Sequence, residues 1–277
     1  MKRVVLWVLA FVITVSFAVY QRKTGPTYPV DGAIELPRGT VAYMLERSHG
    51  GPGDEDVVLF DPAHALDGAV LSYRRFRTDD EWTKVDMIRS GDNLSAFLPH
   101  QPPAGKLEYR IEGTVGEQVI PVTDQPVVIR FKGAVPAGVL IPHVFMMFAA
   151  VLLSVRIGLG LGFSEDIRRL VVVAVVLLTV GGLILGPTVQ KYAFGEFWTG
   201  VPFGWDLTDN KTLLAFLAWL PALFLTRKGE KKGRLATAFA VLVMLAVYLV
   251  PHSVWGSEFD YEKGHVATGP QESGGTE

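Results

Sequence analysis

The hydrophobic positions of the chain gather into five long runs, and polar residues dominate the segments between them. The runs cover residues 4–20, 135–155, 170–189, 212–225 and 235–250. Each is close to the length that crosses ~30 Å of hydrocarbon at ~1.5 Å per residue. The fourth run is the shortest, so we expect its helix to begin in the segment before it. The pattern predicts five membrane-spanning helices.

Basic residues between the runs predict how these helices are oriented. They stand in three places: Lys2 and Arg3, then Arg156 with Arg168 and Arg169, then the segment 227–234. The positive-inside rule puts all three on the cytoplasmic side of a membrane. Residues 21–134, the connector between the third and fourth runs, and the chain after residue 250 then lie outside. We therefore expect a bacterial inner-membrane protein with a cytoplasmic N-terminus and a periplasmic C-terminus.

The first run lies in a segment, residues 1–23, that is either a retained anchor or a cleaved signal. Ser16 and Ala18 stand at spacings that a signal peptidase accepts. The run is longer than the ~7–15 apolar residues of a usual signal peptide, which favours an anchor. Residues 135–253 then form a four-helix membrane domain with an external aromatic loop at 190–211.

Residues 24–134 follow the period of β-strands. Apolar and charged side chains alternate through residues 106–112, as in a strand with one buried face. Other short segments of this kind begin at Leu71, Trp82, Asn93 and Pro126, with Gly and Pro between them. This spacing predicts an antiparallel sandwich, and the glycine-rich segment 48–55 predicts a loop.

This part of the chain resembles the immunoglobulin-like or fibronectin-like modules of bacterial exported proteins. The resemblance rests on a Tyr-Arg strand at Tyr73, a W-x-x-V-x-M strand at Trp82 and a Leu-Glu-Tyr strand at Leu107. The predicted fold class is thus a polytopic α-helical membrane protein, with an N-terminal anchor and a four-helix bundle, that carries an exported all-β immunoglobulin-like sandwich. Such sandwiches host many unrelated roles, of which a spacer or docking module is the plainest.

Composition narrows the functional classes. With 277 residues, 49% of them hydrophobic and 19% charged, the chain is too apolar for an ordinary soluble domain and long enough for two units. The absence of cysteine excludes disulfides, thiolate metal sites and covalently attached haem. The sequence has no phosphate-binding loop, hydrolase motif or zinc-protease motif, so it does not indicate an enzyme.

The partners that we expect are the lipid bilayer and membrane or periplasmic proteins. The basic segment 227–234 suits anionic lipid head groups, and nucleic-acid binding would require a much larger basic surface. Residues 254–277 form an external tail, which we expect to be mostly disordered because its polar, small residues from Gly264 onward cannot build a core.

The candidate chemistry lies around the connector YAFGEFWTGVPFGWDLTDNKTLL, residues 192–214. Its many aromatic rings suit a membrane–water boundary. His143 and His252 each follow a proline, one on either side of the connector in the sequence. Counted from the cytoplasmic edge at ~1.5 Å per residue, they lie about 20 Å and 26 Å up. The two imidazoles can therefore share one level near the outer surface.

Residues 194–198 and Gly204-Trp205-Asp206 resemble a divergent WWD motif, found in membrane proteins that handle haem in cytochrome c biogenesis. That family carries a Trp-rich external loop flanked by two histidines. The resemblance implies a haem b held by His143 and His252, with Trp198, Trp205 and Asp206 against the macrocycle.

Simpler alternatives exist for each of these features. The rings can form an interfacial belt, and the His143 imidazole can bond to a nearby carbonyl. A metal site made of Glu196, Glu258, Asp260 and His265 is conceivable, but carboxylates near a membrane surface are more often solvated. The main functional alternative to haem handling is a non-catalytic accessory or scaffold subunit of a membrane complex, which docks exported partners through the sandwich.

Overall fold

The computed structural model describes residues 1–163, 165–226, 231–251 and 256–267. The chain divides into two compact units. The helical unit contains residues 1–26 and 135–257, and the two-sheet domain contains residues 27–134 and 258–267. Each unit is described by itself.

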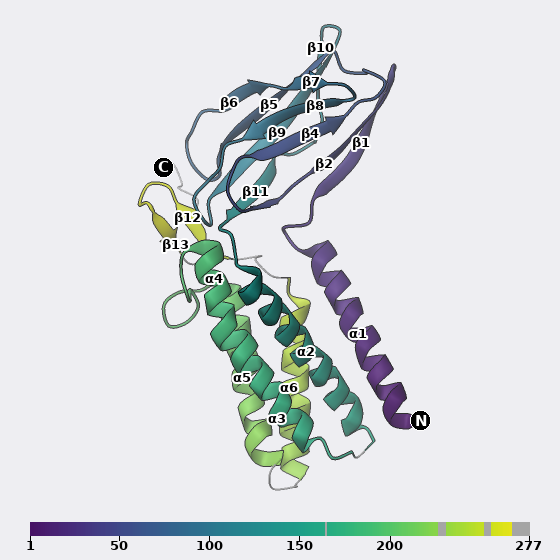
Figure 1. Cartoon of the computed structure of the whole chain (residues 1–277), viewed down its shortest axis with the longest axis vertical. Coiled ribbons are helices and arrows are strands. Elements are labelled where there is room, and N and C mark those ends of the chain that lie inside the picture. Colours follow the sequence, from purple (N-terminus) through teal and green to yellow (C-terminus); the bar gives the residue numbers. More distant parts are fainter. Residues whose placement is uncertain (164, 227–230, 252–255, 268–277) are drawn as a thin grey trace, which may run out of the picture. The chain divides into compact units, whose positions relative to one another are not determined.

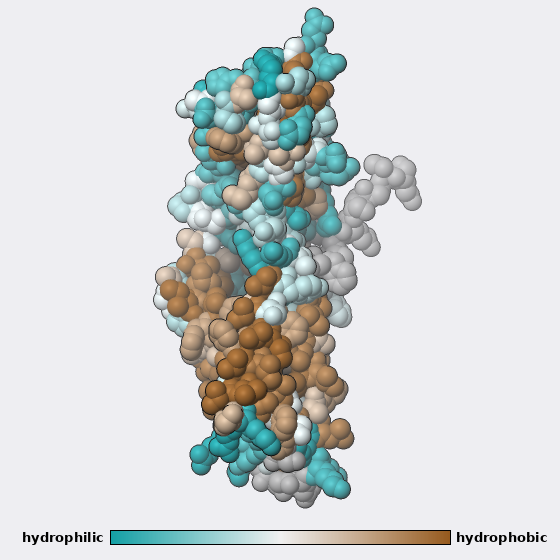
Figure 2. All heavy atoms as spheres, turned by 90° about the vertical axis from the view of Figure 1, so that its right-hand side faces the viewer, coloured by the Kyte–Doolittle hydropathy of each residue, from teal (hydrophilic) through white to brown (hydrophobic). Residues whose placement is uncertain are grey.

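The helical unit consists of helices that lie side by side (Figure 1). They are α1 (Lys2–Thr24), α2 (Ala137–Leu161), α3 (Arg168–Leu177), the π-helix η1 (Leu178–Leu185), α4 (Gly186–Phe194), α5 (Leu207–Thr226) and α6 (Lys231–Leu249). Within the described residues, four helices are long and apolar enough to cross a membrane: α1, α2, α6 and the continuous helix Arg168–Phe194. Figure 2 shows hydrophobic residues dominating the surface over the helices. The unit is therefore compatible with a membrane by length and composition.

The five hydrophobic runs all form helices. Each helix agrees with its run to within two residues at one end and extends four to six residues beyond it at the other. The fourth helix, α5, begins at Leu207 inside the aromatic connector, as its short apolar run predicts. One feature was not predicted: the third run changes from α-helix to π-helix at Leu178 and back at Gly186.

Small residues allow the helices to pack closely around Trp219, whose side chain is fully buried. Two glycines of η1 face neighbouring helices: a Cβ added at Gly181 would lie 2.8 Å from Met146 Cβ, and one at Gly182 would lie 2.8 Å from Thr212 Cγ2. Any side chain there would force the helices apart. Ala10 of α1 also lies in this core, so the first helix packs onto the others.

The two-sheet domain is built from short strands around one hydrophobic core. The strands are β1 (Val30–Leu36), β2 (Gly39–Leu45), β3 (Ser48–Gly50), β4 (Glu55–Phe60), β5 (Gly68–Arg75), β6 (Thr83–Asp86), β7 (Ile88–Ser90), β8 (Asn93–Leu98), β9 (Lys106–Val115), β10 (Gln118–Pro121), β11 (Val127–Lys132), β12 (Glu258–Asp260) and β13 (His265–Ala267). Sheet A has the order β1-β2-β4-β8-β7, and sheet B has the order β3-β11-β9-β5-β6, with β10 beside β9.

The predicted alternation is confirmed in β9, where Leu107, Tyr109 and Ile111 are buried. All five predicted strand segments form strands. The predicted loop at 48–55 is wrong at both ends, because β3 pairs in parallel with β11 and Glu55 begins β4. The glycine-rich composition of this segment gave no strand signal for β3. The strand forms because it pairs with β11.

The tail also differs from the expected disordered segment. Residues 258–267 form the hairpin β12–β13 within the two-sheet domain, and Gly264, which has a positive φ, forms its turn. Glu258 forms ion pairs with Lys106 and Arg77, and Tyr261 Oη donates hydrogen bonds to Gln101 and to the Lys106 carbonyl. These contacts are with residues far away in the sequence, so the local composition did not indicate them. The remaining tail, 268–277, lies outside the described residues.

Asp61 fixes the turn after β4. Its fully buried carboxylate accepts hydrogen bonds from the Ala65 and Leu66 N–H groups at 2.7 and 3.1 Å, and from Arg89 Nη2 at 2.7 Å. Burial by itself would raise the pKa of Asp61. The bonds from Arg89 and the two backbone N–H groups outweigh that effect and lower the pKa below its ordinary value of 3.8. The ionised form is therefore the one that the fold stabilises.

We predict that Asp61→Asn destabilises the two-sheet domain by about 2 kcal/mol at neutral pH, because an amide N–H₂ would face donors. Amide hydrogen exchange of residues 61–71 in the full chain should then be roughly 30-fold faster than in the wild type. Because the pKa of Asp61 is lower in the folded than in the unfolded protein, its ionised carboxylate stabilises the fold above pH 3.8. This stabilisation is lost as the pH falls through the folded-state pKa, so the stability difference between wild type and Asp61→Asn should shrink in acid. Asp124→Asn, at an exposed position, is the control; equal protection in wild type and Asp61→Asn would contradict the prediction.

Candidate functional site

The aromatic connector folds into tight turns that lie against the first turn of α5. The N–H groups of Phe203 and Gly204 donate to the Gly200 carbonyl, and Asp206 N–H donates to the Thr199 carbonyl. Gly200 is buried, and a Cβ there would lie 2.6 Å from Asp209 Cβ. Only glycine lets the connector approach the helix this closely.

Asp206 begins α5 and also holds the segment after α6. Its Oδ1 accepts hydrogen bonds from the N–H groups of Thr208 and Asp209 at 2.8 and 3.3 Å, which is the geometry of an N-cap. Its Oδ2 accepts from Ser257 N–H at 2.9 Å and Ser257 Oγ at 3.0 Å. Asp206 and Ser257 are both buried, so this carboxylate joins two segments far apart in the sequence.

A second buried carboxylate, Asp209 of α5, binds the connector at Thr199. Its Oδ2 accepts from Thr199 N–H at 2.6 Å and from Thr199 Oγ1 at 3.2 Å. Gln190 of α4 donates its amide to Thr199 Oγ1 at 2.6 Å, and that hydroxyl lies 2.8 Å from Ser257 Oγ. These five side chains, Gln190, Thr199, Asp206, Asp209 and Ser257, form a continuous network that we call the buried latch.

Lys211 completes the end of the bundle. Its side chain is buried, and Nζ donates to the carbonyls of Val250 and Pro251 at 2.7 and 3.4 Å. These carbonyls end α6, where a cation is favourable because it meets the negative end of the helix dipole. The lysine thus has a structural role here, because it holds the end of α6 against the start of α5.

The rings of the connector lie on the side away from the latch. Phe203 is 77% exposed, Trp205 is 70% exposed and Phe197 is 57% exposed. Trp198 is half-buried and donates its indole N–H to the Val201 carbonyl at 3.1 Å. The latch therefore holds a rigid loop that presents large apolar rings outward, a surface suited to an apolar ligand or a membrane interface.

His143 lies on α2 opposite the π-helix. Its Nδ1 is 2.8 Å from the carbonyl oxygen of Gly181, so Nδ1 carries the proton and donates it. Nε2 of the neutral ring is then the basic nitrogen. A π-helix shifts carbonyls out of the regular ladder, and such segments often occur at functional sites. A nearby carbonyl as partner is what the simpler sequence interpretation predicts.

His252 lies outside the described residues, as does Trp255, so the predicted pairing of the two imidazoles stays a prediction. The structure does bring Asp206 together with Asp209 and with the segment after α6. Sequence reasoning missed Gln190, Thr199 and Ser257, which belong to the latch. The spacing of Asp206 and Asp209 ahead of an apolar run was an N-cap signal, whereas nothing local indicated Ser257.

The residues present fit a haem in part. A half-buried imidazole with a fixed tautomer and a basic Nε2 suits an axial ligand, and Trp205 offers an open aromatic face. Asp206 does not fit the expected position against the macrocycle, because both of its oxygens are used by the latch. Among the described residues, no three or more His, Cys, Asp or Glu side chains are grouped so that they could hold a metal ion. The conceivable metal site of Glu196, Glu258, Asp260 and His265 is therefore not formed in the described structure.

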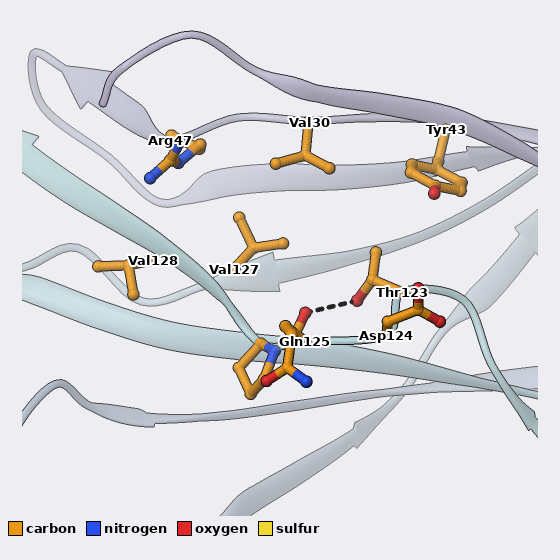
Figure 3. Close-up of a pocket in the computed structure, with 9 residues that line it drawn as sticks. Val30, Tyr43, Arg47, Thr123, Asp124, Gln125, Val127 and Val128 are labelled. Carbon is orange, nitrogen blue, oxygen red and sulfur yellow. Dashed lines mark hydrogen bonds between the residues drawn. The ribbon is translucent and has the colours of Figure 1, made fainter. Parts of the chain in front are cut away.

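The two-sheet domain holds a separate cleft of about 340 Å³ (Figure 3). Val30 and Tyr43 line it from one sheet, Val127 lines it from the other, and Arg47 and Asp124 also lie on its wall. None of the predicted site residues lies there.

Comparisons of the chain with protein-family models, with curated proteins and with solved structures found no match.

Proposed function

We propose that this chain is an inner-membrane protein that binds haem b near the periplasmic surface and serves cytochrome assembly or electron transfer. In this proposal α1 is a retained anchor, the N-terminus is cytoplasmic, and the two-sheet domain is periplasmic. The apolar helices and the basic residues at 2–3, 156–169 and 227–234 support that topology.

The observation that carries the proposal is the geometry of His143. A ligating histidine usually donates its other ring N–H to a carbonyl or carboxylate, which fixes the ring and makes the ligating nitrogen more basic. The Gly181 carbonyl does this for Nδ1 of His143. Nε2 is then the nitrogen that would hold the iron, and His252 is the second proposed ligand. Bound haem would supply one-electron redox chemistry.

The other residues have positioning roles. Trp198 and Trp205 would exclude water from one side of the site, and the buried latch would hold the loop that carries them. Asp206 keeps its role in the latch and contributes to the site through the loop that it fixes. Iron held by two imidazoles has no open coordination position, so the proposal is of an electron carrier or haem carrier rather than an enzyme.

An absorption spectrum of the purified protein tests this function. Protein produced with haem available should show the spectrum of a low-spin b-type haem, because two imidazoles would complete the iron coordination. A colourless preparation that also fails to take up added haem would end the haem proposal.

A second candidate function is that of an accessory subunit that docks exported proteins. It is favoured by the outer face of sheet A, where Met44, Phe60, Ile88 and Phe97 are each about half exposed or more. In this proposal the two-sheet domain is an immunoglobulin-like module. Its two mainly antiparallel sheets around one core support that assignment.

A further inference from the structure

The two sheets of the two-sheet domain present opposite kinds of surface. On the outer face of sheet B, Arg74 pairs with Glu108 at 2.6 Å, and the guanidinium groups of Arg74 and Arg110 each lie 4.7 Å from the centre of the Trp82 ring. Arg74, Glu108 and Arg110 of this face thus interact with partners within the domain. Sheet A has no comparable arrangement.

The outer face of sheet A carries exposed apolar side chains on four neighbouring strands, β2, β4, β8 and β7. Phe60 lies opposite Ala42 in the ladder between β4 and β2. On β8, Phe97 lies opposite Asp56, four residues from Phe60 along β4, and Ile88 of β7 lies opposite Ser95, two residues from Phe97. Exposed fractions are 49% for Phe60, 58% for Phe97 and 74% for Ile88. Large exposed apolar side chains gathered on one sheet face commonly mark an interaction site.

The charged side chains that the strands of sheet A place on this face are carboxylates. Asp31 lies opposite the exposed Met44, and Asp56 lies opposite Phe97. Glu35 stands on β1 and accepts only a hydrogen bond from the Thr40 hydroxyl. The strands of sheet A contain no lysine, and their single arginine, Arg89, points inward to Asp61. Asp31, Glu35 and Asp56 thus form an acidic border on this face, and Arg38, the basic residue of the β1–β2 turn, pairs with Asp67 instead.

We propose that the outer face of sheet A, defined by Met44, Phe60, Ile88 and Phe97, docks a protein whose own apolar contact surface is bordered by Lys or Arg. Opposite charges around a desolvated apolar centre give specificity and speed association. A second copy of this chain would bring two acidic borders together, and an anionic lipid surface would repel the same carboxylates. The inference rests on the accessory role proposed above.

Site-specific photo-crosslinking in the full-length, membrane-embedded protein tests the surface. One variant carries p-benzoylphenylalanine at Phe97, and the matched control carries it at Lys84, on β6 of sheet B. We expect an adduct from position 97, absent from position 84, with a different polypeptide whose crosslinked surface is apolar and flanked by Lys or Arg. Adding Asp31→Lys and Asp56→Lys should lower the yield about tenfold, because the steering charges are reversed.

Other outcomes would overturn the inference in distinguishable ways. An adduct between two copies of the chain, a lipid adduct, or a yield unaffected by the charge reversal would each contradict the proposed partner. An adduct only from position 84 would refute the surface while leaving an accessory role. No adduct from either position would remove support from both. Unchanged hydrogen exchange of residues 61–71 shows that each variant is folded.

Discussion

Replacing His143 by alanine is expected to abolish the low-spin haem spectrum of the purified protein. Loss of a partner outside the ligand set already costs metal sites roughly 10–100-fold in affinity, so loss of the ligand itself should weaken haem binding by more than about 100-fold. The measurement is a haem titration followed by absorbance, for wild type and variant in the same detergent. A variant that keeps the wild-type spectrum and affinity would show that His143 is not a ligand.

Two further variants separate ligation from structural roles. His143→Gln keeps an N–H group that can donate to the Gly181 carbonyl, so we expect a folded protein of near wild-type thermal stability that does not bind haem. His265→Ala changes an exposed histidine of β13 and should leave the spectrum unchanged. If His143→Gln unfolds the helical unit, the imidazole has a packing role beyond its hydrogen bond.

Asp206→Ala is expected to destabilise the helical unit by about 3 kcal/mol. The change removes the N-cap of α5, worth about 1 kcal/mol, and leaves the buried N–H and hydroxyl of Ser257 without their charged acceptor, worth about 1.5–3 kcal/mol. The midpoint of thermal unfolding in detergent should fall by about 6 °C or more.

Hydrogen exchange locates this effect within the structure. In Asp206→Ala, the first turn of α5 and residues 256–257 should lose protection together, because one carboxylate holds both segments. Glu196→Ala is the matched control, since Glu196 is an exposed carboxylate in the same connector. If the two variants unfold at the same temperature, the latch does not stabilise the connector.

The helices could be predicted from the sequence because hydrophobic runs of membrane length have few alternative structures. A start of α5 inside the aromatic connector was also expected from the short fourth run, and the structure places it at Leu207. The π-helix could not be predicted, since it depends on how η1 packs against α2 through Gly181 and Gly182. For the same reason the sequence offered a carbonyl only as the simpler alternative for His143 and could not identify it as that of Gly181.

In the two-sheet domain, too, elements with a strong local pattern could be predicted from the sequence, and elements held by distant residues could not. Strong alternation identified β9, whereas the edge strand β1 contains Gly32 and two acids and gave a weaker signal. The hairpin β12–β13 could not be predicted, because its sequence has no strand pattern. Glu258 and Tyr261 are instead held by residues more than 150 positions earlier. The role of Asp206 in the latch required the same long-range information from Ser257.

The most direct test of the central claim is the electron paramagnetic resonance spectrum of the ferric, haem-loaded protein, because it reports the axial ligands of the iron. Coordination by His143 and His252 predicts a single low-spin ferric species, which becomes high-spin or disappears when either histidine is replaced by alanine. A high-spin signal in the wild-type protein, or a low-spin signal that survives both replacements, would contradict haem ligation by these two residues.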